Sequence, residues 1–146
     1  MKFISSEYDS YLGHAVVIMQ HLGKKFIGTA NLHPDDSENA SEFAGCALAE
    51  LRATVKALKY ERTIAKQASD EALKFVHACE NYAKFDPESD TAKVIYRQLN
   101  RKIKQVNDLT DQINELLEQI QTFGQRRQII LNALKRRKIE MSKKDK

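Results

Sequence analysis

The sequence predicts a mainly α protein: an N-terminal β-hairpin followed by a long antiparallel helical hairpin that assembles into a homo-oligomeric helical bundle. Composition supports this class, because the 146 residues are 42% apolar and 30% charged, with only five glycines and two prolines. Apolar side chains also recur at spacings of three and four residues along most of the chain. The length suits a single domain, residues 1–146.

The N-terminal segment, residues 1–36, contains the predicted β-hairpin. His14–His21 is a β-branched run of strand length, and Phe26–Leu32 has the composition of a returning strand. Leu22–Lys25 separates the two runs, and its Gly23 can take the positive φ that a tight hairpin turn needs. Because an isolated hairpin is marginal in water, it must pack on a helix or pair with another chain.

The first long helix is predicted over residues 37–84, where the apolar period is continuous. Either Ser37 or Ser41 can cap its start. A stretch of about forty residues is long for a globular helix, so a kink or a break near Ser69-Asp70 stays open.

The second long helix is predicted over residues 87–141, with a basic tail at residues 142–146. Asp86 suits the N-cap and Pro87 the first helical position. Such a helix is stable only if its apolar seam is buried, and the first helix, folded back at Pro87, supplies part of that partner. Two helices alone have too little core for this length, which predicts a homo-oligomer. The seam follows a heptad pattern: Val106, Leu109, Ile113, Leu116, Ile120 and Phe123.

Charge and motif content narrow the functional class. Gln125–Lys146 holds nine Lys or Arg and two acids, a balance of +7, whereas residues 1–124 balance at −3. This end favours a polyanion or a phosphate-bearing ligand, or it is a solvated helix end. No apolar run is long enough for a membrane span and no signal peptide is recognisable, which predicts a cytoplasmic protein. No catalytic or metal-binding motif is present, so we expect neither an enzyme nor a cofactor, and two free cysteines.

The candidate ligand-binding residues are mostly aromatic and basic. Near the end of the second helix an aromatic ring and two guanidiniums can stack a base and hold phosphates, and Asn132 follows five residues after the second arginine. Arg127 falls on the seam, where the alternative is an arginine that snorkels or pairs with a neighbouring chain. Arg52, together with Lys24, Lys25 and Phe26 at the hairpin, is the second candidate. Lys56 lies one helical turn from Arg52, and the alternative is a solvated helix face. The predicted set is Arg52, Phe123, Arg126, Arg127 and Asn132.

The run Lys25–Asp36, which contains Gly28, Ala30, His33, Pro34 and Asp36, and the later phrase Leu48–Ala53 resemble the Thoeris anti-defence family of the first type. These phage proteins open with a β-hairpin and continue as long helices. The resemblance implies a non-catalytic homo-oligomer that sequesters a nucleotide second messenger, either a cyclic ADP-ribose isomer or a cyclic di- or trinucleotide. It also implies action in the host bacterial cytoplasm, and it covers about thirty residues.

Two other functions remain open. The basic C-terminal end could make the protein an inhibitor, such as an anti-CRISPR protein, that binds protein or nucleic acid with a steep salt dependence. The coiled-coil seam alone would also suit a structural phage assembly protein without any ligand. Deleting residues 135–146 would separate the first alternative from nucleotide sequestration.

Overall fold

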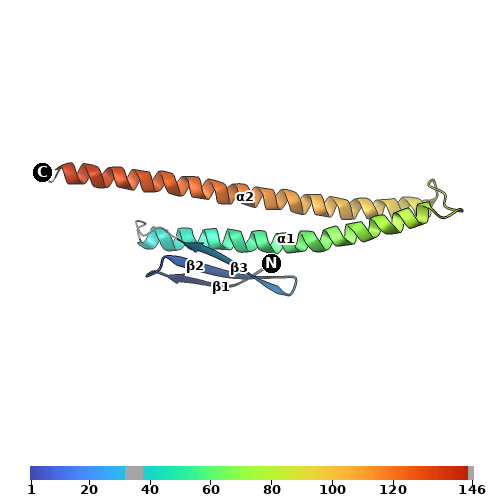
Figure 1. The fold of residues 1–146 in the computed structure, drawn as a ribbon, viewed down its shortest axis with the longest axis horizontal. Coiled ribbons are helices and arrows are strands. Elements are labelled where there is room, and N and C mark those ends of the chain that lie inside the picture. The colour runs from blue at the N-terminus through green and yellow to red at the C-terminus, as the bar shows by residue number, and fades with distance from the viewer. Residues whose placement is uncertain (32–37, 145–146) are drawn as a thin grey trace. The chain divides into compact units, whose positions relative to one another are not determined.

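The computed structural model describes the backbone of residues 1–31 and 38–144, and the side chains of residues 1–31 and 42–123. Three strands come first, followed by two long helices that pack as a helical hairpin (Figure 1). The mainly helical class and the helical hairpin predicted from the sequence are therefore confirmed. The homo-oligomer stays a prediction.

A three-stranded antiparallel sheet forms the N-terminal part of the chain, in the order β1-β2-β3. The strands are β1 (Lys2–Asp9), β2 (His14–His21) and β3 (Lys24–Asn31). The turn between β2 and β3 has two central residues of positive φ, Leu22 at 52° and Gly23 at 75°. This is the hairpin turn whose twist suits two paired strands, and it confirms the role expected of Gly23.

The prediction of a two-stranded hairpin was incomplete, because β1 adds a third strand beside β2. The pairing shifts register between Phe3 and Ser5, so the alternation of apolar and polar side chains is broken there. The connection to β2 is a tight loop in which the Asp9 carboxylate accepts the Tyr11 amide at 2.9 Å. Gly13 ends this loop at a φ of 64°.

The first helix, α1, runs without a break from Glu38 to Glu80, and α2 runs from Asp90 to Lys144. The possible break near Ser69-Asp70 is therefore absent, and α1 ends four residues before the predicted boundary at residue 84. Ser37 and Ser41, the two candidate caps of α1, lie outside the described side chains. The second helix continues three residues past the predicted boundary at residue 141, so most of the expected tail is helical.

The prediction that Asp86 caps α2 and Pro87 begins it was wrong. The Asp86 carboxylate instead accepts a hydrogen bond from the Glu88 amide at 3.0 Å, and this bond closes a turn before the helix. The N-cap is Ser89, whose hydroxyl accepts the Ala92 amide at 3.2 Å and donates to the Asp86 carbonyl at 2.8 Å. Both Asp and Ser suit a cap chemically, and the turn geometry decides between them.

The chain divides into two compact units, residues 1–57 with 115–146 and residues 58–114. In the first unit, the sheet packs on α1 through a core of small and apolar side chains, and Ile120 and Phe123 of α2 contact this core. In the second unit, the buried apolar side chains include Leu99, Leu109 and Ile113. Leu109 and Ile113 belong to the predicted seam, and their burial confirms that face of α2. The core of the first unit is Ala15, Val17, Met19, Ala30, Leu48, Ala49 and Ala53.

Both cysteines, Cys46 and Cys79, are half-buried and free, as the sequence predicts. The Ser6 hydroxyl lies 3.3 Å from the Cys46 sulfur, where it donates a weak hydrogen bond from β1 to α1. Among the described residues, neither helix contains a stretch apolar enough to cross a membrane.

Candidate functional site

At the outer edge of β3, the predicted site residue Arg52 and its helix neighbour Lys56 meet the sheet. β3 pairs with β2 on one side only, so its other side is an edge. Counting from the two-residue turn, His21 and Lys24 form a hydrogen-bonded pair of the β2–β3 ladder, and so do Met19 and Phe26. The carbonyl and amide groups of Ile27 and Thr29 then point to the outer edge. An edge of this kind attracts hydrogen-bonding partners unless it is covered.

Two side chains of α1 bind these outward carbonyls. The Arg52 guanidinium donates to the Thr29 carbonyl at 2.8 Å, and the Lys56 ammonium donates to the Ile27 carbonyl at 2.8 Å. The two donors sit one helical turn apart, and the two acceptors two residues apart on β3, so the spacings of helix and strand match. This arrangement fixes both cations beside the sheet edge, and both side chains remain exposed.

Gly28 explains why the helix comes close enough for these bonds. A Cβ at Gly28 would overlap the Ala49 carbonyl and lie 2.6 Å from the Ala53 nitrogen, so only glycine fits there. Ala49 and Ala53 are fully buried, and Ala30 is almost so. The packing contact between β3 and α1 is therefore made by part of the motif singled out in the sequence: Gly28, Ala30, Leu48, Ala49 and Ala53. The rest of that motif, His33, Pro34 and Asp36, lies outside the described residues.

The remaining predicted site residues lie at and beyond residue 123. Phe123 is half-buried and packs against the core of the first unit beside Ile120, so part of its ring serves packing. Arg126, Arg127 and Asn132 lie outside the described side chains, and their roles stay predictions. The attachment of Arg52 and Lys56 to β3 was not expected from the sequence, which placed Arg52 with Lys24, Lys25 and Phe26 instead. The sequence did contain a signal for this attachment to β3. Arg52 and Lys56 each directly precede a buried alanine of α1, Ala53 and Ala57.

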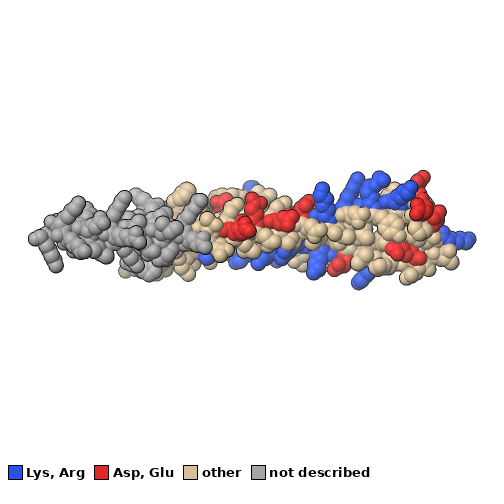
Figure 2. All heavy atoms as spheres, turned by 90° about the horizontal axis from the view of Figure 1, so that it is seen from above, with Lys and Arg blue, Asp and Glu red and all other residues tan. Residues whose placement is uncertain are grey.

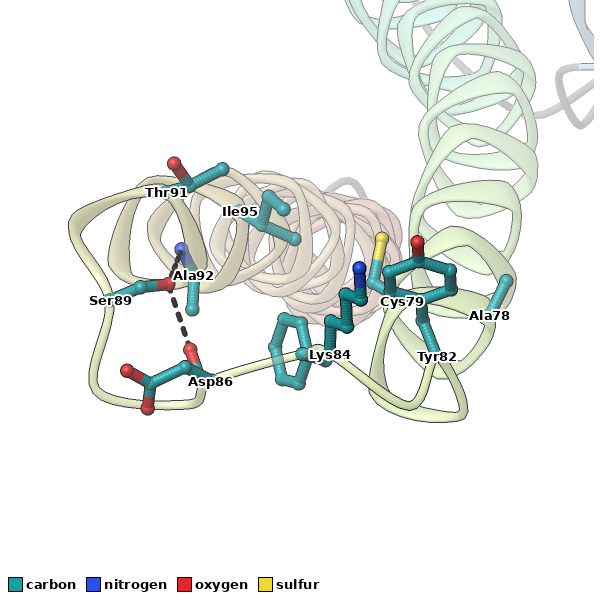
Figure 3. A pocket seen from close by; sticks show the side chains of 10 residues that line it. Ala78, Cys79, Tyr82, Lys84, Asp86, Ser89, Thr91, Ala92 and Ile95 are labelled. Carbon is teal, nitrogen blue, oxygen red and sulfur yellow. Dashed lines mark hydrogen bonds between the residues drawn. The ribbon is translucent and has the colours of Figure 1, made fainter.

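A shallow pocket of about 500 Å³ lies in the second unit, at the turn between α1 and α2 (Figure 3). Its walls include Cys79 and Tyr82 from one side of the turn and Ile95 from α2, with the Lys84 ammonium beside them. The sequence of this segment indicates only a helix boundary. Nothing in its lining singles out a ligand, because the pocket is mainly apolar and carries one cation and one acid, Asp86.

Beside this turn, Tyr96 of α2 forms an edge-to-face contact with Phe85, with ring centroids 6.4 Å apart. Partial burial raises the pKa of the Tyr96 hydroxyl, and the Glu80 carboxylate that accepts its hydrogen bond raises the pKa further. Tyr96 thus stays protonated and ties the end of α1 to the start of α2. We interpret this group as structural.

No cluster of three or more His, Cys, Asp or Glu side chains suited to a metal ion occurs within residues 1–31 and 42–123. Comparison of the chain with protein-family models, with curated proteins and with solved structures finds no match. The contacts within this chain therefore define the candidate site. Its best-defined part is the outer edge of β3 with Arg52 and Lys56.

Proposed function

We propose that this protein is a phage anti-defence protein that binds a nucleotide-derived second messenger and retains it without degrading it. The ligand class, a cyclic ADP-ribose isomer or a cyclic oligonucleotide, comes from the family resemblance. The observation that carries the proposal is the pair of exposed cations, Arg52 and Lys56, held at the edge of β3 by hydrogen bonds of 2.8 Å.

Phosphate recognition suits this pair. A guanidinium has five N–H donors, and Arg52 uses one of its terminal nitrogens on Thr29, so other donors can reach a phosphate oxygen. The Lys56 ammonium has three donors, of which one is directed at Ile27. Because the β3 carbonyls already hold both side chains, these side chains lose less conformational entropy when a ligand binds. The outward amides of Ile27 and Thr29 add donors along the same edge.

A base-stacking contact would come from Phe123, with Arg126, Arg127 and Asn132 as further phosphate or base contacts. These four residues keep the roles predicted from the sequence, and they follow one another on α2 within the same compact unit as Arg52. Stacking on an aromatic ring tolerates different bases. We therefore expect the phosphates, more than the base, to select the ligand at the β3 edge.

The test is retention of an intact nucleotide. The purified protein is incubated with a panel of cyclic ADP-ribose isomers and cyclic di- and trinucleotides, washed, and heated, and the released compounds are identified by mass spectrometry. We expect one class to be retained and released unchanged. Arg52→Ala should lower the affinity for that class about tenfold or more, because a charge-assisted hydrogen bond contributes about 1.5–3 kcal/mol.

Lys59→Ala is the matched control, since Lys59 is an exposed cation on the next turn of α1 and its removal changes the net charge equally. This variant should retain the nucleotide as the unmodified protein does. Two results would contradict the proposal: the absence of any retained nucleotide, or equal retention by Arg52→Ala and Lys59→Ala. Release of a hydrolysed product would contradict sequestration without turnover.

A further inference from the structure

The exposed face of α2 carries its charges in two blocks. Six positions recur at spacings of four and three residues, so they share one face of the helix. The first three are basic, the last three are acidic, and all six side chains are exposed. Figure 2 shows basic atoms gathered along one stretch and acidic atoms along the next. We call this face the charged stripe: Arg97, Arg101, Lys104, Asp108, Asp111 and Glu115.

The order of charges in the stripe is unfavourable for a helix that faces only water. Neighbours three and four residues apart carry the same charge in every case except Lys104 and Asp108. Like charges at these spacings destabilise a helix, whereas alternating charges would stabilise it. A partner with the opposite order of charges would convert these repulsions into attractions.

A second copy of this chain has that order when it lies antiparallel. The stripe is symmetric about Val106, so a two-fold axis there places Lys104 of one copy opposite Asp108 of the other. The same axis places Arg101 opposite Asp111. It also places Arg97 opposite Glu115, and each pair occurs twice. A parallel arrangement in register would instead place like charges together.

We propose that two copies of this protein associate antiparallel through the charged stripe of α2. This proposal goes beyond nucleotide binding, and it gives the predicted homo-oligomer one specific face and orientation. The stripe is about 27 Å long from residue 97 to 115 at 1.5 Å per residue. A contact of this length and one helix width buries roughly 300 Å² per copy, which is the size class of a weak interface. Its strength must therefore depend on charge and fall as salt rises.

Sedimentation of the full chain over a range of concentrations, at about 20 mM and about 500 mM salt, tests the proposal. At low salt we expect a monomer–dimer equilibrium that stops at the dimer, and at high salt at least a tenfold weaker association. Arg101→Glu with Lys104→Glu makes the stripe acidic except at Arg97, and Asp108→Lys with Asp111→Lys makes it basic except at Glu115. Each double variant alone should lose the dimer, and an equal mixture of the two should regain it.

The mixture also shows that the variants are folded, because only intact stripes can pair. The control reverses two exposed cations of α1, Lys59→Glu with Lys66→Glu, and should leave the low-salt dimer unchanged. Three results would overturn the proposal. They are a monomer at every concentration, an oligomer that neither salt nor stripe reversal weakens, and an open-ended polymer, which would indicate a staggered parallel contact instead.

Discussion

Replacing Gly28 by alanine tests the close contact that positions the candidate site. The added Cβ would meet the backbone of α1, where the Ala53 nitrogen lies at 2.6 Å and the Ala49 carbonyl overlaps it. Ordinary contact begins near 3.4 Å, so α1 would have to withdraw from β3 by about 0.8 Å or more. The obstacle is backbone rather than a flexible side chain, and it cannot rotate away.

The expected cost is about 3 kcal/mol of unfolding free energy, at the upper end of the roughly 1–3 kcal/mol typical of overpacked cores. Replacing glycine by alanine inside a strand usually raises the unfolding free energy by about 0.5–1 kcal/mol. A decrease at Gly28 would therefore be caused by the steric overlap. The same withdrawal would lengthen the Arg52 and Lys56 bonds to β3, which are now 2.8 Å each. Nucleotide affinity should therefore fall with stability.

Urea unfolding followed by circular dichroism measures this cost, with Thr29→Ala as the control. Thr29 is the next residue of β3, its side chain faces the opposite side of the sheet, and it is exposed. Its replacement should cost less than about 1 kcal/mol. If Gly28→Ala and Thr29→Ala agree within about 0.5 kcal/mol, which is near the scatter expected of surface changes, the argument from close contact is refuted.

Three further predictions concern the turns and the helix start. Leu22→Asn should raise the unfolding free energy by about 1 kcal/mol, because Leu22 has a φ of 52° that asparagine tolerates better; an unchanged urea midpoint would contradict this. Ser89→Ala should lower it by about 1 kcal/mol through loss of the α2 cap, whereas Ser10→Ala, at an exposed loop position, should not. Because the fold raises the pKa of Tyr96, its contribution to stability is complete below pH 10 and is lost as pH rises through the folded pKa. Glu80→Gln should lower that pKa in an NMR titration, and no shift would exclude Glu80 as a cause.

The helical hairpin could be predicted because its signal is periodic and long. The seam of α2 repeats over nearly three heptads, and Leu109 and Ile113 within it are buried. The start of α2 could not be placed to the residue, because Asp86 and Ser89 are both good caps. Only the turn that Asp86 closes shows which of them is used.

The sheet was harder to predict than the helices. The hairpin of β2 and β3 has a clear turn at Gly23, whereas β1 has the polar pair Ser5-Ser6 and a register shift beside it. Much of β1 is exposed, so its side chains carry little of the alternation that reveals a half-buried strand.

The candidate site was predicted only in part, because its geometry is tertiary. Arg52 and Lys56 could be recognised as neighbours on one helix face. Their bonds to β3 depend on which edge of the sheet α1 covers, and that depends on the missing side chain at Gly28. Local spacing does not contain this information.

The most direct test of the central claim is to observe the backbone amides of β3 while a retained nucleotide is added. We predict that the NMR signals of the Ile27 and Thr29 amides and of the Arg52 guanidinium shift together and saturate at one ligand stoichiometry. The Gly23 amide, at the distant turn of the same hairpin, should stay unchanged. Saturable binding that leaves Ile27, Thr29 and Arg52 unshifted would contradict the claim that phosphates bind at the β3 edge.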